Sequence, residues 1–375
     1  MTSSTTGTKR ATVRINVPLP PHDIDAFLAD ARQIIESGWL AGGEHVAALE
    51  RELEPWTGHR PVIAVTTATN GLIAAMTTLG EPGAEAIVPS YTFLATWQTV
   101  LWSRMVPVVA DVDERGLLDP RAVAAAITDR TRVIVPVHLA GMPAPTDELR
   151  DLARQNGAAL VVDAAHALGS RHADRPVGAD GDAEVFSISS TKPLGAGEGG
   201  FVTARDDELE QALRRFAFYG GRPGLGDTYG PGLNLRVPEL TAALARRNLE
   251  RFEAQLERRS EIHRRYATGM EGLPLRLSGP LAGQRSAHKD QLVWLDDPAD
   301  RSPLVEQLTD AAVETRLYHS IAIPDLTAFE GRVSSTDRGR DLAKRTLAIP
   351  MHGRLTDDEV DHVVDTMHDY FQGGR

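Results

Sequence analysis

The chain has 375 residues, of which 42% are hydrophobic, enough to bury a sizeable core and to form two domains. Its formal net charge of -12 at pH 7 argues against nucleic acid or an anionic membrane surface as the main partner, because like charges repel. The absence of cysteine excludes disulfides, thiolate metal sites and cysteine nucleophiles. These observations favour a soluble enzyme that acts on small molecules.

Residues 1–12 are polar and rich in serine and threonine, so we expect a disordered tail that offers little apolar surface to offset ordering entropy. The chain shows no apolar run of signal-peptide length and no stretch of the roughly 20 apolar residues that a membrane span needs. A cytoplasmic protein that binds neither membrane nor nucleic acid is therefore predicted.

Residues 21–35 form the first periodic segment, and Gly38 follows as a stop signal. Its apolar residues share one helical face, which we expect to pack: Ile24, Phe27, Leu28, Ala31, Ile34 and Ile35. A second helix is predicted over residues 44–53.

Between residues 61 and 204, short apolar strands alternate with amphipathic segments. Seven strands are predicted, at residues 62–65, 86–89, 106–112, 132–137, 159–164, 185–189 and 201–204. Such alternation indicates βαβ units, hence an α/β fold whose mostly parallel seven-stranded sheet lies between helices. Ligands of such sheets bind at the carboxyl ends of the strands.

Residues 238–270 read as one long charged helix that bridges two domains. Strand signals at residues 291–295 and 313–318 and a closing helix at 357–371 follow on a smaller scale. We therefore expect a large domain over residues 13–250 and a smaller C-terminal α/β domain over 251–375.

Two side chains at predicted strand ends carry the chemistry. Asp163 ends one strand, and Lys192 follows 29 residues later, after another strand and within a glycine-rich turn. A pyridoxal phosphate (PLP) site needs such a pair, because the lysine forms a Schiff base and the acid keeps the pyridine nitrogen protonated. Spacing alone is equally compatible with an exposed ion pair on loops.

Candidates for binding the phosphate lie nearby. Residues 65–76 place small polar side chains where a helix begins, so backbone N–H groups and the hydroxyl of Thr69 could bind a dianion there. An ordinary N-cap is the alternative. Ser187, five residues before Lys192, offers a second hydroxyl, unless it is a buried strand serine bonded to backbone.

Six ordered blocks cover nearly the whole chain: residues 37–56, 87–96, 163–170, 186–200, 232–240 and 348–360. Together they resemble the DegT/DnrJ/EryC/StrS-type nucleotide-sugar aminotransferases, PLP-dependent enzymes of the aspartate-aminotransferase-like fold type I. The resemblance implies that Lys192 carries the cofactor, as the only lysine placed to hold its aldehyde. It also implies that Asp163 pairs with the pyridine nitrogen and that Ser187 contacts the phosphate.

Five further residues match the family blocks. Ala68 and Thr69 match the phosphate-binding turn, His166 the residue beside the cofactor ring, and Phe93 the aromatic residue on the opposite ring face. Asn234 matches the asparagine that reaches the phosphate from the partner subunit, which implies a homodimer with shared active sites. Without the family, His166 and Phe93 would be read as core and Asn234 as part of a surface loop.

Rival interpretations are weaker. Residues 195–200 fit the G-x-G-x-x-G pattern of dinucleotide-binding proteins, but a strand rather than a helix follows them. His362 and His368 are six residues apart, which does not make a helical metal pair, and no metal is predicted. A sugar dehydratase of the same family would lack the lysine that stands at position 192. A catalytically silent regulatory protein of this fold would not need Lys192, Asp163 and Ser187 together.

The block sequences favour amino transfer from glutamate or glutamine to a nucleotide-linked deoxysugar. TDP-4-keto-6-deoxy-D-glucose, aminated to TDP-4-amino-4,6-dideoxy-D-glucose, is the predicted acceptor, in secondary-metabolite or surface-glycan biosynthesis. A 3-keto-sugar or a cyclitol ketone remains open as acceptor.

Overall fold

In a computed structural model of the chain, the described residues are 11–18, 20–21, 23–221 and 226–373. The predicted tail therefore lies outside them except for Ala11 and Thr12. The helices are α1 Ile24–Ser37, α2 Glu44–Leu53, α3 Ala68–Leu79, α4 Leu94–Trp102, α5 Pro120–Ala126, α6 Thr146–Gln155, α7 Asp207–Ala217, α8 Glu239–Leu249, α9 Phe252–Gly269, α10 Arg301–Asp310, α11 Asp337–Arg345 and α12 Asp357–Gln372. No helix among these residues is long and apolar enough to cross a membrane.

An eight-stranded sheet forms the centre of the larger part, in the order β1-β9-β8-β5-β4-β2-β3-β13. Its strands are β1 Val62–Val65, β2 Glu85–Pro89, β3 Val106–Ala110, β4 Thr131–Ile134, β5 Ala159–Asp163, β8 Ala183–Ser187, β9 Gly200–Ala204 and β13 Arg332–Val333. Only β9 runs antiparallel to its neighbours. All seven predicted strands are present, and the mostly parallel α/β fold is confirmed. The eighth, β13, was not predicted, because two residues carry no periodic pattern.

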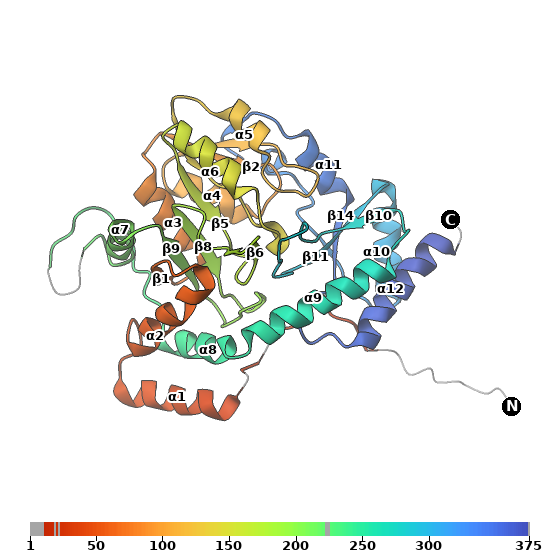
Figure 1. Cartoon of the computed structure of the whole chain (residues 1–375), viewed down its shortest axis with the longest axis horizontal. Coiled ribbons are helices and arrows are strands. Elements are labelled where there is room, and N and C mark those ends of the chain that lie inside the picture. The colour runs from red at the N-terminus through yellow and green to blue at the C-terminus, as the bar shows by residue number, and fades with distance from the viewer. Residues whose placement is uncertain (1–10, 19, 22, 222–225, 374–375) are drawn as a thin grey trace.

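Helices cover both faces of this sheet (Figure 1). Successive side chains of a strand point to opposite faces, so Val62 and Ala64 join the core beneath α2, α5, α6 and α8. Ile63 and Val65 join the core beneath α3, α4 and α7. Burial on both faces explains why these strands read as continuous apolar runs rather than alternating ones.

The charged stretch at residues 238–270 forms two helices rather than one, because α8 ends at Leu249 and α9 begins at Phe252. Arg251 between them leaves helical geometry, with ψ at 15°. The break lets α8 pack on α2 while α9 packs on α12. In Figure 1, α9 leads from the first sheet toward the second.

The second sheet is antiparallel, with the order β10-β11-β14-β12. Its strands are β10 Leu275–Leu277, β11 Gln291–Leu295, β12 Arg316–Leu317 and β14 Thr346–Ile349; β6 Arg171–His172 and β7 Arg175–Pro176 form a separate hairpin. We propose a domain boundary near residue 250 on this basis. Backbone pairings cross it, among them Val13 with Val313, Arg171 with Arg285 and β13 with β3.

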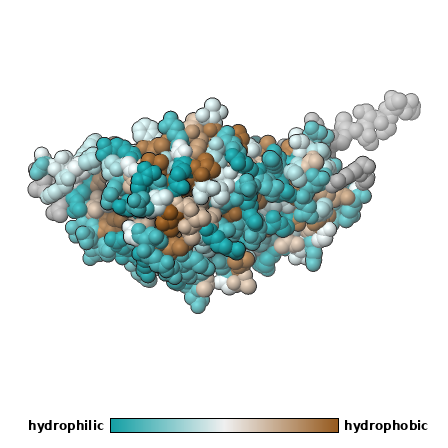
Figure 2. All heavy atoms as spheres, turned by 90° about the horizontal axis from the view of Figure 1, so that it is seen from above, coloured by the Kyte–Doolittle hydropathy of each residue, from teal (hydrophilic) through white to brown (hydrophobic). Residues whose placement is uncertain are grey.

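Helix α1 packs only in part, contrary to prediction. Ile34 is its buried residue, whereas Ile24, Leu28 and Ile35 are 57%, 56% and 63% exposed. An apolar stripe predicts that one face of a helix is covered, but it does not identify the segment or partner that covers it. Elsewhere, the face of the molecule in Figure 2 shows hydrophobic residues in small groups within a largely hydrophilic surface.

Candidate active site

A cavity of about 450 Å³ opens where the parallel strands end. Residues that follow β1, β2, β4, β5 and β8 line it, as the strand-end rule predicts. Seven of the eight predicted site residues lie on its wall: Ala68, Thr69, Phe93, Asp163, His166, Ser187 and Lys192. Asn234 does not.

Asp163 is the last residue of β5 and is only 5% exposed. Its Oδ2 accepts a hydrogen bond from Thr96 Oγ1 of α4 at 2.9 Å, and its Oδ1 accepts one from the N–H of Ala165 at 3.2 Å. Burial raises the pKa of Asp163, while these two donors and the charge of Lys192 act in the opposite direction. The carboxylate is thus fixed in direction at the cavity wall.

Lys192 lies in the turn that joins β8 to β9. The turn is held by its own backbone, since Lys192 N donates to Ser189 O at 2.9 Å and Ser190 N donates to Gly197 O at 2.7 Å. Burial, followed by the positive charge of Lys289, lowers the pKa of Lys192 to about 8. A substantial neutral fraction near physiological pH suits an amine that must act as a nucleophile and as a base.

The amino end of α3 forms another part of the wall. Thr67 is the N-cap and accepts from Asn70 N at 3.1 Å, so the ordinary cap is Thr67 rather than Thr69. Among the described residues, the N–H groups of Ala68 and Thr69 and the hydroxyl of Thr69 make no hydrogen bond. Free donors at the positive end of a helix suit a phosphate.

Ser187 lies beside this helix end because Gly200 allows a close approach. Ser187 pairs with Gly200 across β8 and β9, and a Cβ on Gly200 would lie 2.7 Å from Ala68 N. The Ser187 hydroxyl accepts from Ser189 N at 3.3 Å and keeps its own proton to donate. Ser187 is thus a strand serine bonded to backbone, as the alternative interpretation predicts, but it also lines the cavity.

His166 and Phe93 are not core residues. The ring of His166 is partly exposed in the cavity, and its Nδ1 accepts from Ala140 N at 3.3 Å. Burial, followed by the charge of Lys192, holds the pKa of His166 well below its usual range, so the ring is neutral. Phe93 precedes α4 and is 56% exposed, which leaves its ring free to contact a ligand.

Asn234 is exposed and lies away from its own chain's cavity. It pairs with Phe218, and its Oδ1 accepts from Arg236 Nε at 2.9 Å. Within one chain, Asn234 therefore lies in a surface loop, as the alternative interpretation predicts.

The C-terminal part of the chain supplies a cavity wall that the sequence did not reveal: Lys289, Asp290, Arg316, Leu317, Tyr318 and His319. Lys289 therefore corrects the expectation that Lys192 is the only lysine placed to hold the cofactor. Burial lowers the pKa of Lys289, while its ion pair with Asp290, 2.8 Å from Lys289 Nζ to Asp290 Oδ1, acts in the opposite direction and occupies the amine. The sequence signal was weak, a charged pair directly before a predicted strand.

Comparison with known proteins decides the family, because the model of the DegT/DnrJ/EryC1/StrS aminotransferase family matches residues 21–368. The chain belongs to that family. It is 30% identical over 368 residues to the spore coat polysaccharide biosynthesis protein SpsC of Bacillus subtilis (strain 168), covering 92% of this chain and 94% of SpsC.

Two solved structures share the fold of this chain and about 30% of its sequence. DesI, crystallised in the presence of its TDP-sugar product, is 32% identical with a TM-score of 0.90 over 97% of this chain and 94% of its own. DesV of S. venezuelae is 29% identical with a TM-score of 0.87 over 95% of this chain and 99% of its own. The protein is therefore a PLP-dependent aminotransferase of fold type I within a family of sugar aminotransferases.

The residues at the cavity fit this cofactor. A buried carboxylate, a lysine of lowered pKa and the free donors at the start of α3 occupy one space of about 450 Å³, within the range of small-molecule sites. These are the groups that a pyridinium nitrogen, an aldehyde and a phosphate require.

Proposed function

We propose that this aminotransferase transfers an amino group from glutamate or glutamine to the keto group of a nucleotide-linked deoxysugar. The observation that carries the proposal is the placement of Lys192 and Asp163 on one cavity, beside the free donors of α3. TDP-4-keto-6-deoxy-D-glucose is the proposed acceptor, aminated at carbon 4. The 32% identity to DesI, which was crystallised with its TDP-sugar product, supports this choice.

Each residue has a distinct proposed task. When bound, PLP supplies an electron sink for the negative charge that develops on the substrate carbon. Lys192 would hold the cofactor and then carry the proton between the substrate carbon and the cofactor carbon in each half of the reaction, as a positioned base and acid. Asp163 stabilises the positive charge on the ring nitrogen, while Ala68, Thr69 and Ser187 bind the phosphate.

Phe93 and His166 are proposed to contact opposite faces of the cofactor ring. Phe93 is more than half exposed and lines the cavity, and His166 is a neutral ring that accepts a hydrogen bond from the N–H of Ala140. Stacking of this kind fixes the ring plane, which sets the direction in which a substrate bond is broken.

The direct test is a panel of nucleotide-linked keto-sugars assayed for aminated product by mass spectrometry. Purified enzyme should be yellow, should lose that colour with glutamate, and should aminate the 4-keto-6-deoxyhexose on thymidine diphosphate. Preference for a 3-keto-sugar or a cyclitol ketone would change the acceptor and leave the reaction class intact. A colourless protein that binds no PLP would contradict the whole proposal.

We also propose a homodimer with shared active sites. Asn234 is exposed and does not line its own cavity, and two large exposed hydrophobic residues adjoin it along the backbone: Tyr219 and Leu233 are 53% and 40% exposed. The backbone connects them, since Tyr219 N donates to Leu233 O at 2.9 Å. Exposed apolar surface of this kind marks interfaces between proteins.

Complementation tests the shared site. Lys192→Ala chains mixed with Asn234→Asp chains should regain activity after subunit exchange, because one site of each mixed dimer pairs an intact Lys192 with an intact Asn234. Asn234→Asp alone must first be shown to be impaired. Mixed dimers that stay inactive, or a fully active monomer, would contradict shared sites.

Location and pathway complete the proposal. We propose that the enzyme acts in the cytoplasm, in the synthesis of a secondary metabolite or a surface glycan. The relative SpsC is by its name a protein of spore coat polysaccharide biosynthesis, which supports the second of these pathways.

A further inference from the structure

Apart from the exposed Glu198, three charged side chains on the cavity wall have no task in the scheme above. Lys289 and Asp290 stand directly before β11 and are 3% and 4% exposed, and Arg316 lies in β12. Lys289 Nζ and Arg316 Nη2 each lie 2.8 Å from the same oxygen, Oδ1 of Asp290. Two basic side chains thus share one carboxylate, so this cluster, all of which lines the cavity, has one more basic group than acidic groups.

A purely structural role does not explain this excess. Lys289 alone would neutralise Asp290, and a second buried or half-buried cation adds a desolvation cost without a further anion to offset it. Burial would raise the pKa of Asp290, but Lys289 and Arg316 hold it well below its usual range, so the carboxylate stays charged between its two partners. An anion in the cavity would complete the arrangement.

Donor groups for that anion are already in place. Arg316 has five N–H donors, and within the described residues Asp290 is the side chain to which its guanidinium donates. Its guanidinium carbon lies 5.5 Å from the centre of the Tyr318 ring, which limits its orientation. The adjacent His319 lines the same cavity, and its Nε2 is buried without a hydrogen-bond partner in the described part of the chain.

The phosphate of PLP has separate anchors at the start of α3 and at Ser187, so the second cationic position suits a different anion. A planar guanidinium matches the geometry of a carboxylate, which can accept two parallel hydrogen bonds. We propose that Lys289 and Arg316, held together by Asp290, form a carboxylate-binding subsite that receives the amino donor. This inference rests on the proposed function, which assigns that donor as glutamate or glutamine. A keto-sugar with its own carboxylate would present the same chemistry.

The test compares cavity variants with a matched surface variant. Arg316→Gln and Lys289→Met remove one cation each, Arg316→Lys keeps the charge, and Lys344→Met removes an exposed lysine of α11. Glutarate, a dicarboxylate without an amino group, is titrated into each PLP-loaded protein by calorimetry. The concentration dependence of colour loss with L-glutamate is measured in parallel.

We expect both cavity variants to bind glutarate and glutamate roughly tenfold to a hundredfold more weakly, as for a lost charge-assisted hydrogen bond. Arg316→Lys should recover part of the affinity, and Lys344→Met should match the unmodified enzyme. If the variants instead lose affinity only for a nucleotide-linked keto-hexuronate, the carboxylate belongs to the acceptor and the subsite still stands.

Unchanged affinity of Arg316→Gln for all three ligands would overturn the subsite. Arg316 has a side chain that is 46% exposed, so this variant should fold even if Lys289→Met does not. Failure of the unmodified enzyme to lose colour with any amino acid would instead contradict the proposed function, and the glutarate titration would still test the subsite.

Discussion

Two buried carboxylates on neighbouring strands have opposite surroundings. Asp163 ends β5 and Glu184 lies within β8, and burial raises the pKa of both, that of Glu184 to about 7. Glu184 accepts three backbone hydrogen bonds of 2.6 to 2.8 Å, from the N–H groups of Gly178, Asp180 and Gly181. Asp163 accepts two hydrogen bonds and faces the cavity beside Lys192.

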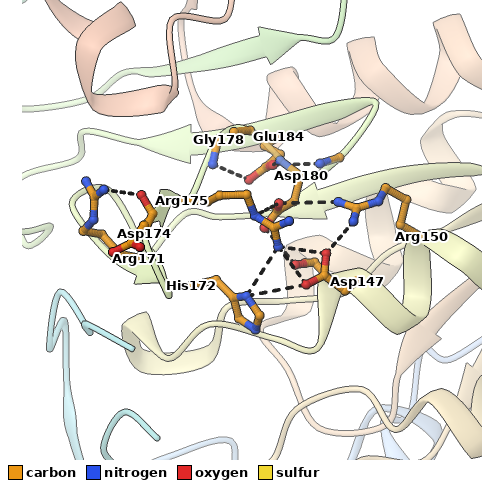
Figure 3. Close-up of polar contacts among 12 residues, drawn as sticks. Asp147, Arg150, Arg171, His172, Asp174, Arg175, Gly178, Asp180 and Glu184 are labelled. Atoms are coloured by element: carbon orange, nitrogen blue, oxygen red, sulfur yellow. Dashed lines mark hydrogen bonds and ion pairs between the residues drawn. The ribbon is translucent and has the colours of Figure 1, made fainter. Parts of the chain in front are cut away.

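The network around Glu184 is closed by further ion pairs (Figure 3). Asp180 accepts from Thr146 Oγ1 at 2.8 Å and lies 3.1 Å from Arg175 Nε, and Arg150 links it to Asp147. The comparison teaches how to tell the two kinds of buried acid apart. A carboxylate satisfied by its own backbone stabilises the fold, whereas one left open toward a cavity with a lysine is placed for a ligand.

Among the changes on the cavity side, where Asp163 and Lys192 lie, loss of Lys192 should have the largest effect. Lys192→Ala should abolish turnover, because the variant lacks the amine that we propose holds the cofactor and moves the proton. In the unmodified enzyme, borohydride reduction with peptide mapping should find PLP on Lys192 among the four lysines of the chain. Label on Lys289 would refute the assignment, and Lys344→Ala serves as the control.

Asp163→Asn should come next, with folding unchanged and a rate lower by a factor on the order of a hundred or more. A neutral amide cannot stabilise a positive ring nitrogen, but it keeps the size of the side chain and can still accept from Thr96. The measurements are kcat and the melting temperature. A rate near that of the unmodified enzyme would place Asp163 in the same structural class as Glu184.

The sequence revealed the cavity-facing residues better than the hydrogen-bond network around Glu184. Asp163, Ser187 and Lys192 could be predicted because their chemistry demands particular residue types at strand ends, and apolar runs marked those strands. Glu184 gave no signal, since its role depends on backbone donors in a loop whose shape no local pattern encodes. Lys289 and Arg316 were missed for a similar reason, because they reach the cavity only once two distant segments meet.

Glu184→Gln should lower the free energy of unfolding by roughly 1–3 kcal/mol and leave kcat unchanged. A glutamine has one acceptor oxygen for three N–H groups, and its amide N–H would face a donor. Chemical denaturation at pH 7 measures the loss, with Glu261→Gln on the exposed side of α9 as control. A large fall in kcat at unchanged stability would show that Glu184 belongs to the active site.

The same residue should give stability a pH dependence of known sign. A raised pKa in the folded state means that the folded protein binds the proton more tightly, so this contribution is present below about pH 4.3 and is lost as the pH rises through 7. The unfolding free energy of the unmodified enzyme minus that of Glu184→Gln should therefore fall as the pH rises across that window. A difference that does not change with pH would contradict the assignment.

Among the changes on the cavity side, Thr96→Val should have the smallest effect, because it removes one hydrogen bond of Asp163 without replacing the carboxylate. Valine nearly matches threonine in shape but removes the hydroxyl that donates to Asp163 Oδ2. That hydrogen bond favours the ionised form, so its loss should raise the pKa of Asp163 further and reduce the ionised fraction at low pH. We expect kcat to fall by roughly tenfold, consistent with one hydrogen bond to a charged group, and its acidic limb to move to higher pH. A fall in kcat without any movement of the limb would mean that Thr96 only positions α4, and the pH profile of kcat separates the two outcomes.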